Sequence, residues 1–143
     1  MKLRSEDGAA LIEFALVLPI LLLLVFGIVD FGIALWNREV VTTASREGAR
    51  FGIIIGDPRP TAAEIKDVVI TALTNAGLNA CDASCVTLDP PTGAEGGKSG
   101  DPLTVRVDYP LSFLVIADFI QGFYKKTFNK DITLSAQTFM KLE

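Results

Sequence analysis

Glu13 carries the most conspicuous chemistry in this sequence, because it places a carboxylate inside a long apolar run. It is the only charged side chain between Ala9 and Val29. A charge at the centre of a membrane helix costs about 2.5–3.5 kcal/mol on insertion scales, and such residues usually have a function. Glu13 lies one turn into the run, where the cost is smaller, but a cationic partner is still expected. The apolar run contains no basic residue that could serve.

Cys81 and Cys85 are the two cysteines of the chain. A zinc site would need further cysteine or histidine ligands, and the sequence has none. The spacing also differs from the C-x-x-C redox motif. We prefer a short-loop disulfide formed in an oxidising compartment; the alternative is a pair of reduced thiols packed near each other. The disulfide interpretation places the C-terminal part of the chain outside the cytoplasm.

Ala44, Gly48 and Gly52 recur every four residues in a segment expected to be helical. Such a stripe of small residues lets another backbone come close. Each glycine costs a helix about 1 kcal/mol relative to alanine, so a close contact is expected in compensation. Two partners remain open: the chain's own sheet, or a neighbouring subunit.

Enzymatic and nucleic-acid functions are disfavoured by composition. The 143 residues include no histidine, which removes the commonest general base and metal ligand. The net charge of −4 and the pI near 4.8 leave no basic patch for phosphates. Gly96-Gly97-Lys98-Ser99 resembles the end of a P-loop, but the required earlier glycine is Thr92. We therefore expect no catalytic residue, no metal and no cofactor.

The apolar run is long enough to cross a membrane. As a helix with a rise of about 1.5 Å per residue, Ala9–Val29 would extend about 31 Å. The hydrocarbon core of a bilayer is about 30 Å thick. The run is longer than the apolar core of an ordinary signal peptide and shows no signal-peptide cleavage site at its end. The apolar sequence ends at Trp36, and tryptophan is typical of membrane interfaces. The mean hydropathy of the whole chain, +0.41, reflects this segment.

Three motifs occur in order over the first fifty residues. The first is Gly8-Ala9-Ala10-Leu11-Ile12-Glu13-Phe14-Ala15-Leu16-Val17-Leu18-Pro19, the second Asp30-Phe31-Gly32, and the third Ala44-Ser45-Arg46-Glu47-Gly48-Ala49-Arg50. The first resembles the type IV prepilin processing site. All three together resemble the TadE/TadG-like minor pilins, or pseudopilins, of the tight-adherence (Flp) pilus system. The C-terminal Met140-Lys141-Leu142-Glu143 is weakly similar as well.

The resemblance implies that a prepilin peptidase cuts between Gly8 and Ala9 on the cytoplasmic side. Glu13 would then be the fifth residue of the mature chain, and the new amine of Ala9 would be a cation. Because Ala9 and Glu13 are one turn apart, they could pair within one helix. The amine of an incoming subunit could instead pair with Glu13 of its neighbour and set the register of an assembly.

The resemblance also implies a location and partners. Basic residues flank both ends of the apolar run, so their count does not orient it. The cysteine pair and the resemblance favour a single pass through the inner membrane, with the N-terminus cytoplasmic and the C-terminal domain extracytoplasmic, and incorporation into a surface filament remains open. Expected partners are the lipid bilayer, the prepilin peptidase, other pilin or pseudopilin subunits and the pilus assembly machinery. A nucleic-acid partner is not expected.

The expected architecture is α+β and pilin-like: a leader (residues 1–8), a transmembrane helix (9–36) and an exported domain (37–143). The long helix should continue to about Ile55, before Asp57-Pro58-Arg59-Pro60. A capping box, Thr61 to Glu64, should open a second helix ending near Gly77. Alternating apolar residues predict strands at residues 86–88, 103–109 and 132–140. Residues 111–123 are apolar and could be helix or loop.

Two functions are compatible with this pattern. The leading one is a minor pilin or pseudopilin that takes part in assembly of a tight-adherence pilus or a related secretion system. The alternative is an uncleaved single-pass anchor whose exported domain binds other envelope proteins as a scaffold.

Overall fold

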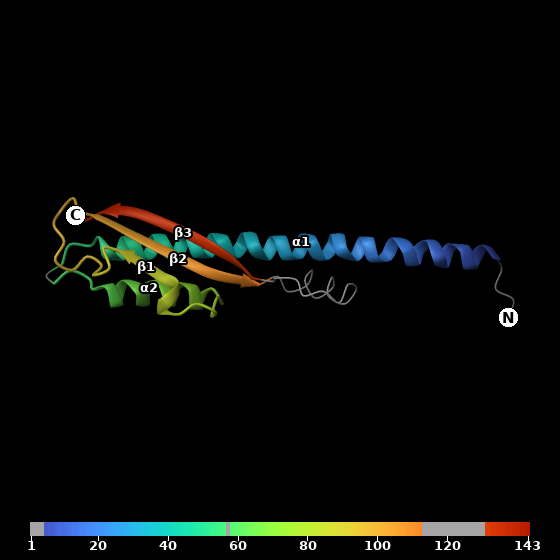
Figure 1. Cartoon of the computed structure of the whole chain (residues 1–143), viewed down its shortest axis with the longest axis horizontal. Coiled ribbons are helices and arrows are strands. Elements are labelled where there is room, and N and C mark those ends of the chain that lie inside the picture. The colour runs from blue at the N-terminus through green and yellow to red at the C-terminus, as the bar shows by residue number, and fades with distance from the viewer. Residues whose placement is uncertain (1–4, 57, 113–130) are drawn as a thin grey trace. The chain divides into compact units, whose positions relative to one another are not determined.

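The computed structural model describes residues 5–56, 58–112 and 131–143. Its elements are, in order, α1 (Ser5–Gly52), α2 (Ala62–Asn75), the short 3-10 helix η1 (Ala83–Cys85), β1 (Val86–Asp89), β2 (Pro102–Ser112) and β3 (Asp131–Lys141) (Figure 1). They fall into two compact units, of which the first contains α1 up to Ile33 and the second contains Ala34–Ser112 and Asp131–Glu143. The α+β class with a long N-terminal helix, a second helix and a small antiparallel sheet is confirmed.

The helix α1 runs through the whole apolar segment without a break. Most side chains of its first part are exposed, with Leu16 and Ile20, for example, 69% and 71% accessible, whereas Asp30 is buried. Pro19 lies inside the helix, and an internal proline is better tolerated in membrane helices than in water-soluble ones. Within the described residues, α1 is the one helix long and apolar enough to cross a membrane.

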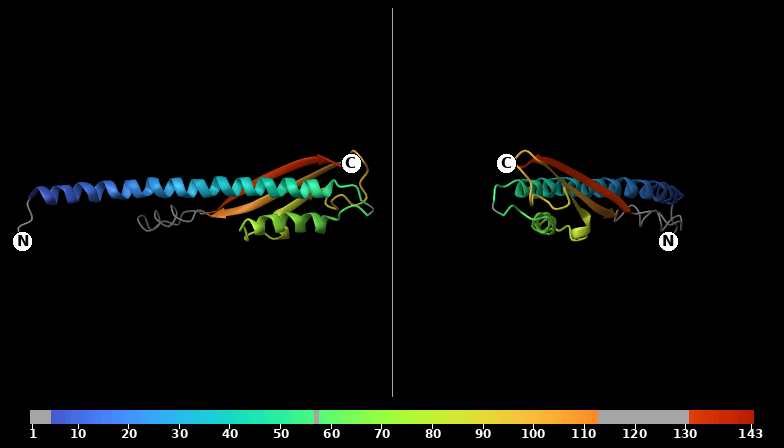
Figure 2. Two further views of the ribbon diagram at one scale, coloured as in Figure 1. Left: turned by 180° about the vertical axis from the view of Figure 1, so that it is seen from behind. Right: turned by 60° about the vertical axis from the view of Figure 1, so that its left-hand side comes forward.

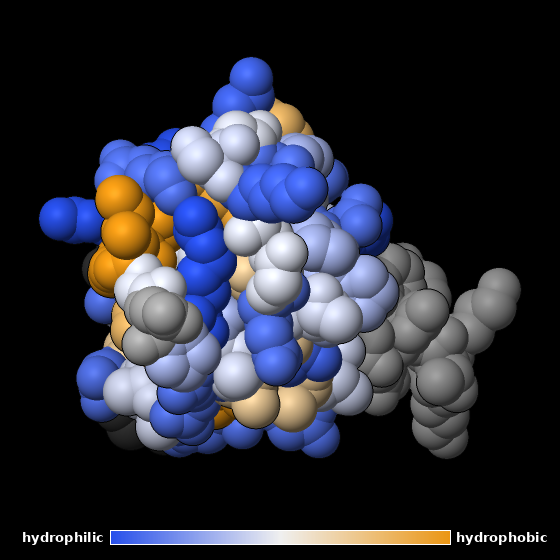
Figure 3. All heavy atoms as spheres, turned by 90° about the vertical axis from the view of Figure 1, so that its left-hand side faces the viewer, coloured by the Kyte–Doolittle hydropathy of each residue, from blue (hydrophilic) through white to orange (hydrophobic). Residues whose placement is uncertain are grey.

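The end of α1 falls at Gly52, three residues before the expected Ile55. The amide of Ile53 still bonds to the carbonyl of Ala49, whereas the amide of Ile54 bonds to the nearer carbonyl of Phe51. The last turn therefore tightens and the helix stops before the prolines. Ile54 and Ile55 remain 51% and 70% exposed in the turn that follows. Figure 3 looks onto this end of the second unit and shows an apolar patch among mostly polar side chains.

The predicted capping box begins α2. The hydroxyl of Thr61 accepts a hydrogen bond from the amide of Glu64, and the Glu64 carboxylate accepts one from the amide of Thr61 at 2.8 Å. Ile65, Val69 and Leu73 form the buried face of the helix. Beyond Asn75, Gly77 has a φ of +83°, a conformation that glycine adopts without strain.

The sheet is antiparallel with the order β1-β2-β3. In the central strand β2, odd-numbered residues are buried and even-numbered ones face outward. This alternation is the one expected for a sheet with one face on a core and one in water. The inward face of β3 is half-buried, with Ala136 opposite Val107 and Met140 opposite Leu103.

All three strands are longer than predicted. β1 extends to Asp89, β2 runs from Pro102 to Ser112 instead of 103–109, and β3 spans Asp131–Lys141. Leu111 and Ser112, which were left open between helix and loop, belong to β2. The rest of that segment, from residue 113 to 123, lies outside the described residues.

The core of the second unit is the layer between the sheet and the two helices. The second part of α1 lies against β2, and α2 runs alongside the same part of α1, as Figures 1 and 2 show. The largest fully buried side chains come from α1, α2 and the strands: Val41, Ile65, Val69, Leu73, Val86, Leu103, Val105 and Val107. The loop between β1 and β2 closes one end of this layer through Ala94, which is fully buried.

Candidate functional site

The residues of the predicted processing site lie near the start of α1. Gly8 is half-buried, and a methyl group at its Cα would have no atom within 4 Å. Ala9 and Glu13 are exposed one turn apart on the same helix. Within the described part of the chain, Glu13 forms no ion pair. The helical geometry therefore leaves the Glu13 carboxylate open to a partner, as the charge argument requires.

The third motif forms the face by which α1 contacts the rest of the second unit. Its small residues Ala44, Ser45, Gly48 and Ala49 are buried, whereas Arg46, Glu47 and Arg50 are exposed. Together with Val41 and Gly52, the buried positions repeat at spacings of three and four, which places them on one side of a helix. The motif thus combines a small-residue contact face with a charged outer face.

Gly48 and Gly52 permit the close approach of α1 to its neighbours. A methyl group at Gly48 would overlap Cγ2 of Val69 on α2, and one at Gly52 would overlap Cδ2 of Leu103 on β2. Ala44 beside them is 1% exposed. The contacts of this stripe therefore lie within the chain, with α2 as well as with the sheet. This favours the chain's own sheet over a neighbouring subunit as the partner of the stripe.

Ser45 was not singled out from the sequence, yet it links α1 to the sheet. Its side chain is fully buried and its hydroxyl donates to the carbonyl oxygen of Val105 at 2.9 Å. The hydroxyl oxygens of Ser45 and Thr138 are 2.8 Å apart, so β3 joins the same network. A buried hydroxyl without a partner costs stability, which explains why Ser45 lies where two strands supply partners. The signal in the sequence is its position beside Ala44 on the buried side of the helix.

Cys81 and Cys85 lie at the two ends of the segment that contains η1. The structure contains both as free cysteines, so it does not show the predicted disulfide, which stays a prediction. Burial, with smaller effects from the neighbouring Cys85 and Asp82, raises the pKa of the Cys81 thiol to about 12. Cys81 in this form is a poor nucleophile, since the thiolate is the reactive species.

The structure does not gather the predicted residues into one site. Gly8, Ala9 and Glu13 belong to the first unit, and the small-residue stripe and the cysteines belong to the second. Among the described residues, no three Cys, Asp or Glu side chains are close enough together to hold a metal ion. The first unit provides an apolar helix with an exposed carboxylate near its start, and the second unit provides a small, tightly packed domain.

Comparison with known proteins supports the resemblance drawn from the motifs. Residues 8–50 match the family model described as TadE-like protein. The match begins at the glycine of the predicted processing site and ends at the last arginine of the third motif, so the resemblance is confirmed over this segment. Comparison with curated proteins and with solved structures gave no significant match.

Proposed function

We propose that this chain is a minor pilin or pseudopilin of the tight-adherence pilus system, cleaved after Gly8 and anchored in the inner membrane by α1. The observation that carries the proposal is the match of residues 8–50 to the TadE-like family. The structure adds a helix of membrane length that continues into a small α+β domain. A subunit of this kind binds lipid before assembly and other subunits after it, and it needs no catalytic machinery.

Assembly is driven by exchange of apolar contacts. The exposed apolar side chains of the first part of α1 contact lipid while the chain waits in the membrane. In an assembly, neighbouring helices replace these lipid contacts. Glu13 then meets the amine of Ala9 on another subunit, so a buried carboxylate gains a cationic partner. The pair forms at only one axial offset, which fixes the register between subunits.

Replacement of Glu13 tests this role. Glu13→Gln removes the charge but keeps the size of the side chain, and Glu13→Asp keeps the charge. We expect Glu13→Gln to insert into the membrane and to be processed normally, while its recovery with the pilus assembly machinery falls by about tenfold or more, as for a lost buried charge pair. Glu13→Asp should retain most of the association. Equal recovery of wild type and Glu13→Gln would contradict the proposed role.

The orientation in the membrane has its own test. If the second unit is extracytoplasmic, Cys81 and Cys85 are exposed to an oxidising environment and should form the predicted disulfide. Alkylation of the purified, non-reduced protein, followed by mass spectrometry, should then find no modifiable thiol. Two alkylated cysteines in freshly prepared membranes would argue for a cytoplasmic domain or for the reduced pair that the sequence left as the alternative.

A further inference from the structure

The strand β3 forms a long edge of the sheet. Among the described strands it pairs with β2 alone, through a continuous register from Asp131 to Lys141. A strand that is paired on one side leaves alternate backbone amides and carbonyls pointing away from the sheet. The opposite edge, β1, is only four residues long and is followed by Pro90 and Pro91. The sheet therefore has one short edge and one long edge.

The long edge lacks the features that usually protect an exposed strand. Natural proteins protect such edges with charged side chains, with proline or with a bulge. From Ile132 to Met140, β3 contains no proline and no charged residue. Its register with β2 contains no bulge over this stretch. The backbone of β3 can therefore exchange hydrogen bonds with a further strand, as in peptide recognition by strand addition.

The inner face of the sheet is incompletely covered at this edge. The inward residues of β2 are fully buried at Leu103, Val105 and Val107. Their partners on β3 are only half-buried: Met140, Thr138 and Ala136. A further strand beside β3 would cover the exposed part of these side chains. Because neighbouring strands pack through side chains on the same face, such a strand needs apolar residues at alternate positions.

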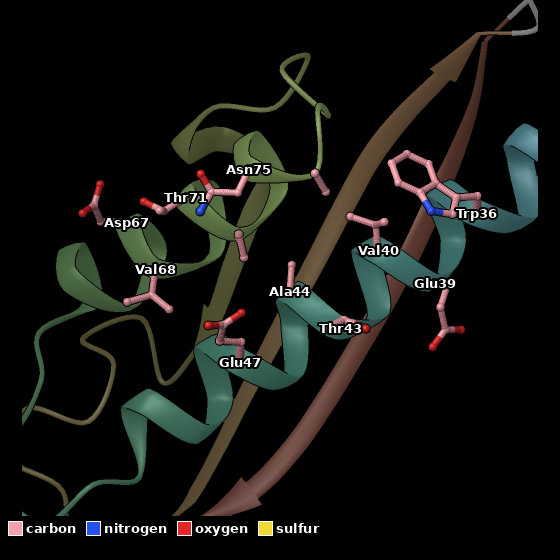
Figure 4. A pocket seen from close by; sticks show the side chains of 12 residues that line it. Trp36, Glu39, Val40, Thr43, Ala44, Glu47, Asp67, Val68, Thr71 and Asn75 are labelled. Atoms are coloured by element: carbon pink, nitrogen blue, oxygen red, sulfur yellow. The ribbon is translucent and has the colours of Figure 1, made fainter.

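The same edge lies on the side of α1 that α2 leaves open. The helix α2 lies on one side of α1, where the two helices border a pocket of about 530 Å³ (Figure 4). The strand β3 lies on the other side of α1, as Figures 1 and 2 show. A strand added to β3 would therefore run along this open side of the helix.

Two arginines occupy that side of α1. Gly48 faces α2, and Ser45 contacts Thr138 of β3. At about 100° per residue, Arg46 lies about 100° beyond Ser45 in the direction that leads away from Gly48. Arg50 follows one turn later on the same side. Both arginines are exposed, so they border the open edge of the sheet.

The charges of these arginines are not compensated nearby. Within the described part of the chain, neither Arg46 nor Arg50 forms an ion pair. Glu39 points away from α2 in Figure 4, but it lies about 10 Å before Arg46 along the helix. Carboxylates on an added strand would meet both arginines, so charge complementarity favours an acidic occupant.

We propose that the open edge of β3 binds an extended, acidic segment of another protein, which adds a strand to the sheet. The open backbone edge selects an extended segment, the half-buried inner face selects alternate apolar residues, and Arg46 and Arg50 select carboxylates. A second copy that pairs through its own β3 would bring no carboxylate between Ile132 and Met140. The inference depends neither on cleavage after Gly8 nor on a filament.

Synthetic peptides test the proposal with the full chain in detergent. The probe is an extended peptide with valine at alternate positions in its middle, glutamate at both ends of the same face, and threonine on the other face. A second peptide has lysine in place of glutamate. We expect the glutamate peptide to slow hydrogen–deuterium exchange in β3, measured by mass spectrometry. It should bind about tenfold more tightly than the lysine peptide, since two attractive ion pairs become repulsive. Equal binding of the two peptides, or protection confined to other elements, would overturn the proposal.

A matched pair of lysine variants tests the place of binding. Ala136→Lys adds a charge on the inner face of the edge strand, where it hinders a neighbouring strand, and should weaken binding of the glutamate peptide by about tenfold. Gln137→Lys adds the same charge on the outer face and should leave binding unchanged. A loss of binding in both variants, or in neither, would contradict strand addition at β3.

Charge reversal on α1 tests the selection of carboxylates. Arg46→Glu combined with Arg50→Glu should invert the preference, so that the lysine peptide binds more tightly than the glutamate peptide. Such an inversion also shows that the changed chain folds. A preference for glutamate that persists would overturn the proposal. So would protection of β3 that rises with the concentration of the chain alone, because a second copy would then occupy the edge.

Discussion

Side-chain size on one face of α1 determines how closely this helix approaches its domain. Gly48 and Gly52 stand where Val69 and Leu103 leave no room for a methyl group. Two glycines in one stretch of helix weaken it by about 1 kcal/mol each relative to alanine. The packing of buried neighbours against the bare backbone offsets that loss. The charged residues of the same motif point away and leave this contact undisturbed.

Enlarging Gly48 should destabilise the domain. In Gly48→Val the new side chain must displace Val69 in a filled core, so we expect a loss of about 1–3 kcal/mol in the free energy of unfolding. Gly32→Val is the matched control in the same helix, because nothing lies within 4 Å of a methyl group at Gly32. Thermal unfolding of the full chain in detergent, followed by circular dichroism, measures both. Equal melting temperatures for the two variants would mean that α1 does not approach α2 as the structure shows.

Removal of the Ser45 hydroxyl should also cost stability. Ser45→Ala leaves the buried carbonyl of Val105 without this donor, and we expect a loss of about 1–2 kcal/mol. Thr42→Ala is the control, because among the described residues the Thr42 hydroxyl donates a hydrogen bond to the carbonyl of Arg38 in its own helix and to no other element. That change should stay within about 0.5 kcal/mol of wild type. Denaturant unfolding of the full chain distinguishes the two, and a cost for Thr42→Ala as large as for Ser45→Ala would refute the assignment.

Among the elements, α2 and β2 depend on carboxylates that accept hydrogen bonds. The Glu64 carboxylate accepts a hydrogen bond from the Thr61 amide and lies within hydrogen-bond distance of the Thr61 hydroxyl, and these two contacts lower its pKa. The pKa of Asp108 is lowered mainly by the hydrogen bond that the Ser135 hydroxyl donates to it, and further by Arg106. Both carboxylates therefore bind protons less readily in the folded chain than in the unfolded chain.

The sign of the pH dependence follows from these lowered values. Each ionised carboxylate contributes its full stability above its unfolded pKa, about 4.3 for Glu and about 3.9 for Asp. The contribution is lost as the pH falls through the lower, folded pKa. Stability should therefore decrease on acidification below about pH 4.3, and Glu64→Gln should make this decrease shallower.

Glu95→Gln, at an exposed carboxylate that accepts no hydrogen bond from the described residues, is the control. Urea unfolding of the full chain at pH 3 to 6 provides the measurement; an identical slope for Glu64→Gln and wild type would contradict this role of the capping box.

The elements show why sequence patterns located some features and missed others. The apolar run, the capping box and the alternation of β2 and β3 are local signals, and all three were predicted. Alternation predicted β2 only as far as Tyr109, and the strand continues through Pro110, although a proline lacks the amide needed by a central strand. The short β1 pairs with Thr104–Val107, and beyond Val107 no other described strand pairs with that edge of β2. At Pro110 only the pairing with Thr133 of β3 remains, and the strand continues.

For the whole molecule, the sequence predicted the anchor and the class of fold but not the surfaces created by packing. A pocket between α1 and α2 is lined by Glu39 and Glu47 from one helix and Asp67 from the other, and it exists because of how α2 lies along α1. The buried position of Ser45 depends on the sheet in the same way. Such features require the tertiary arrangement, since the residues involved are up to 93 positions apart.

For the whole molecule, the proposed function depends most directly on cleavage after Gly8, which would make Ala9 in α1 the N-terminus of the processed subunit. The most direct measurement is the mass of the N-terminal peptide of the chain purified from membranes that contain the prepilin peptidase. We expect a peptide that begins at Ala9, with or without N-methylation, and an uncut chain when Gly8 is replaced by a bulkier residue. An intact Met1 in the presence of the active peptidase would contradict the pilin mechanism and leave the uncleaved, membrane-anchored scaffold.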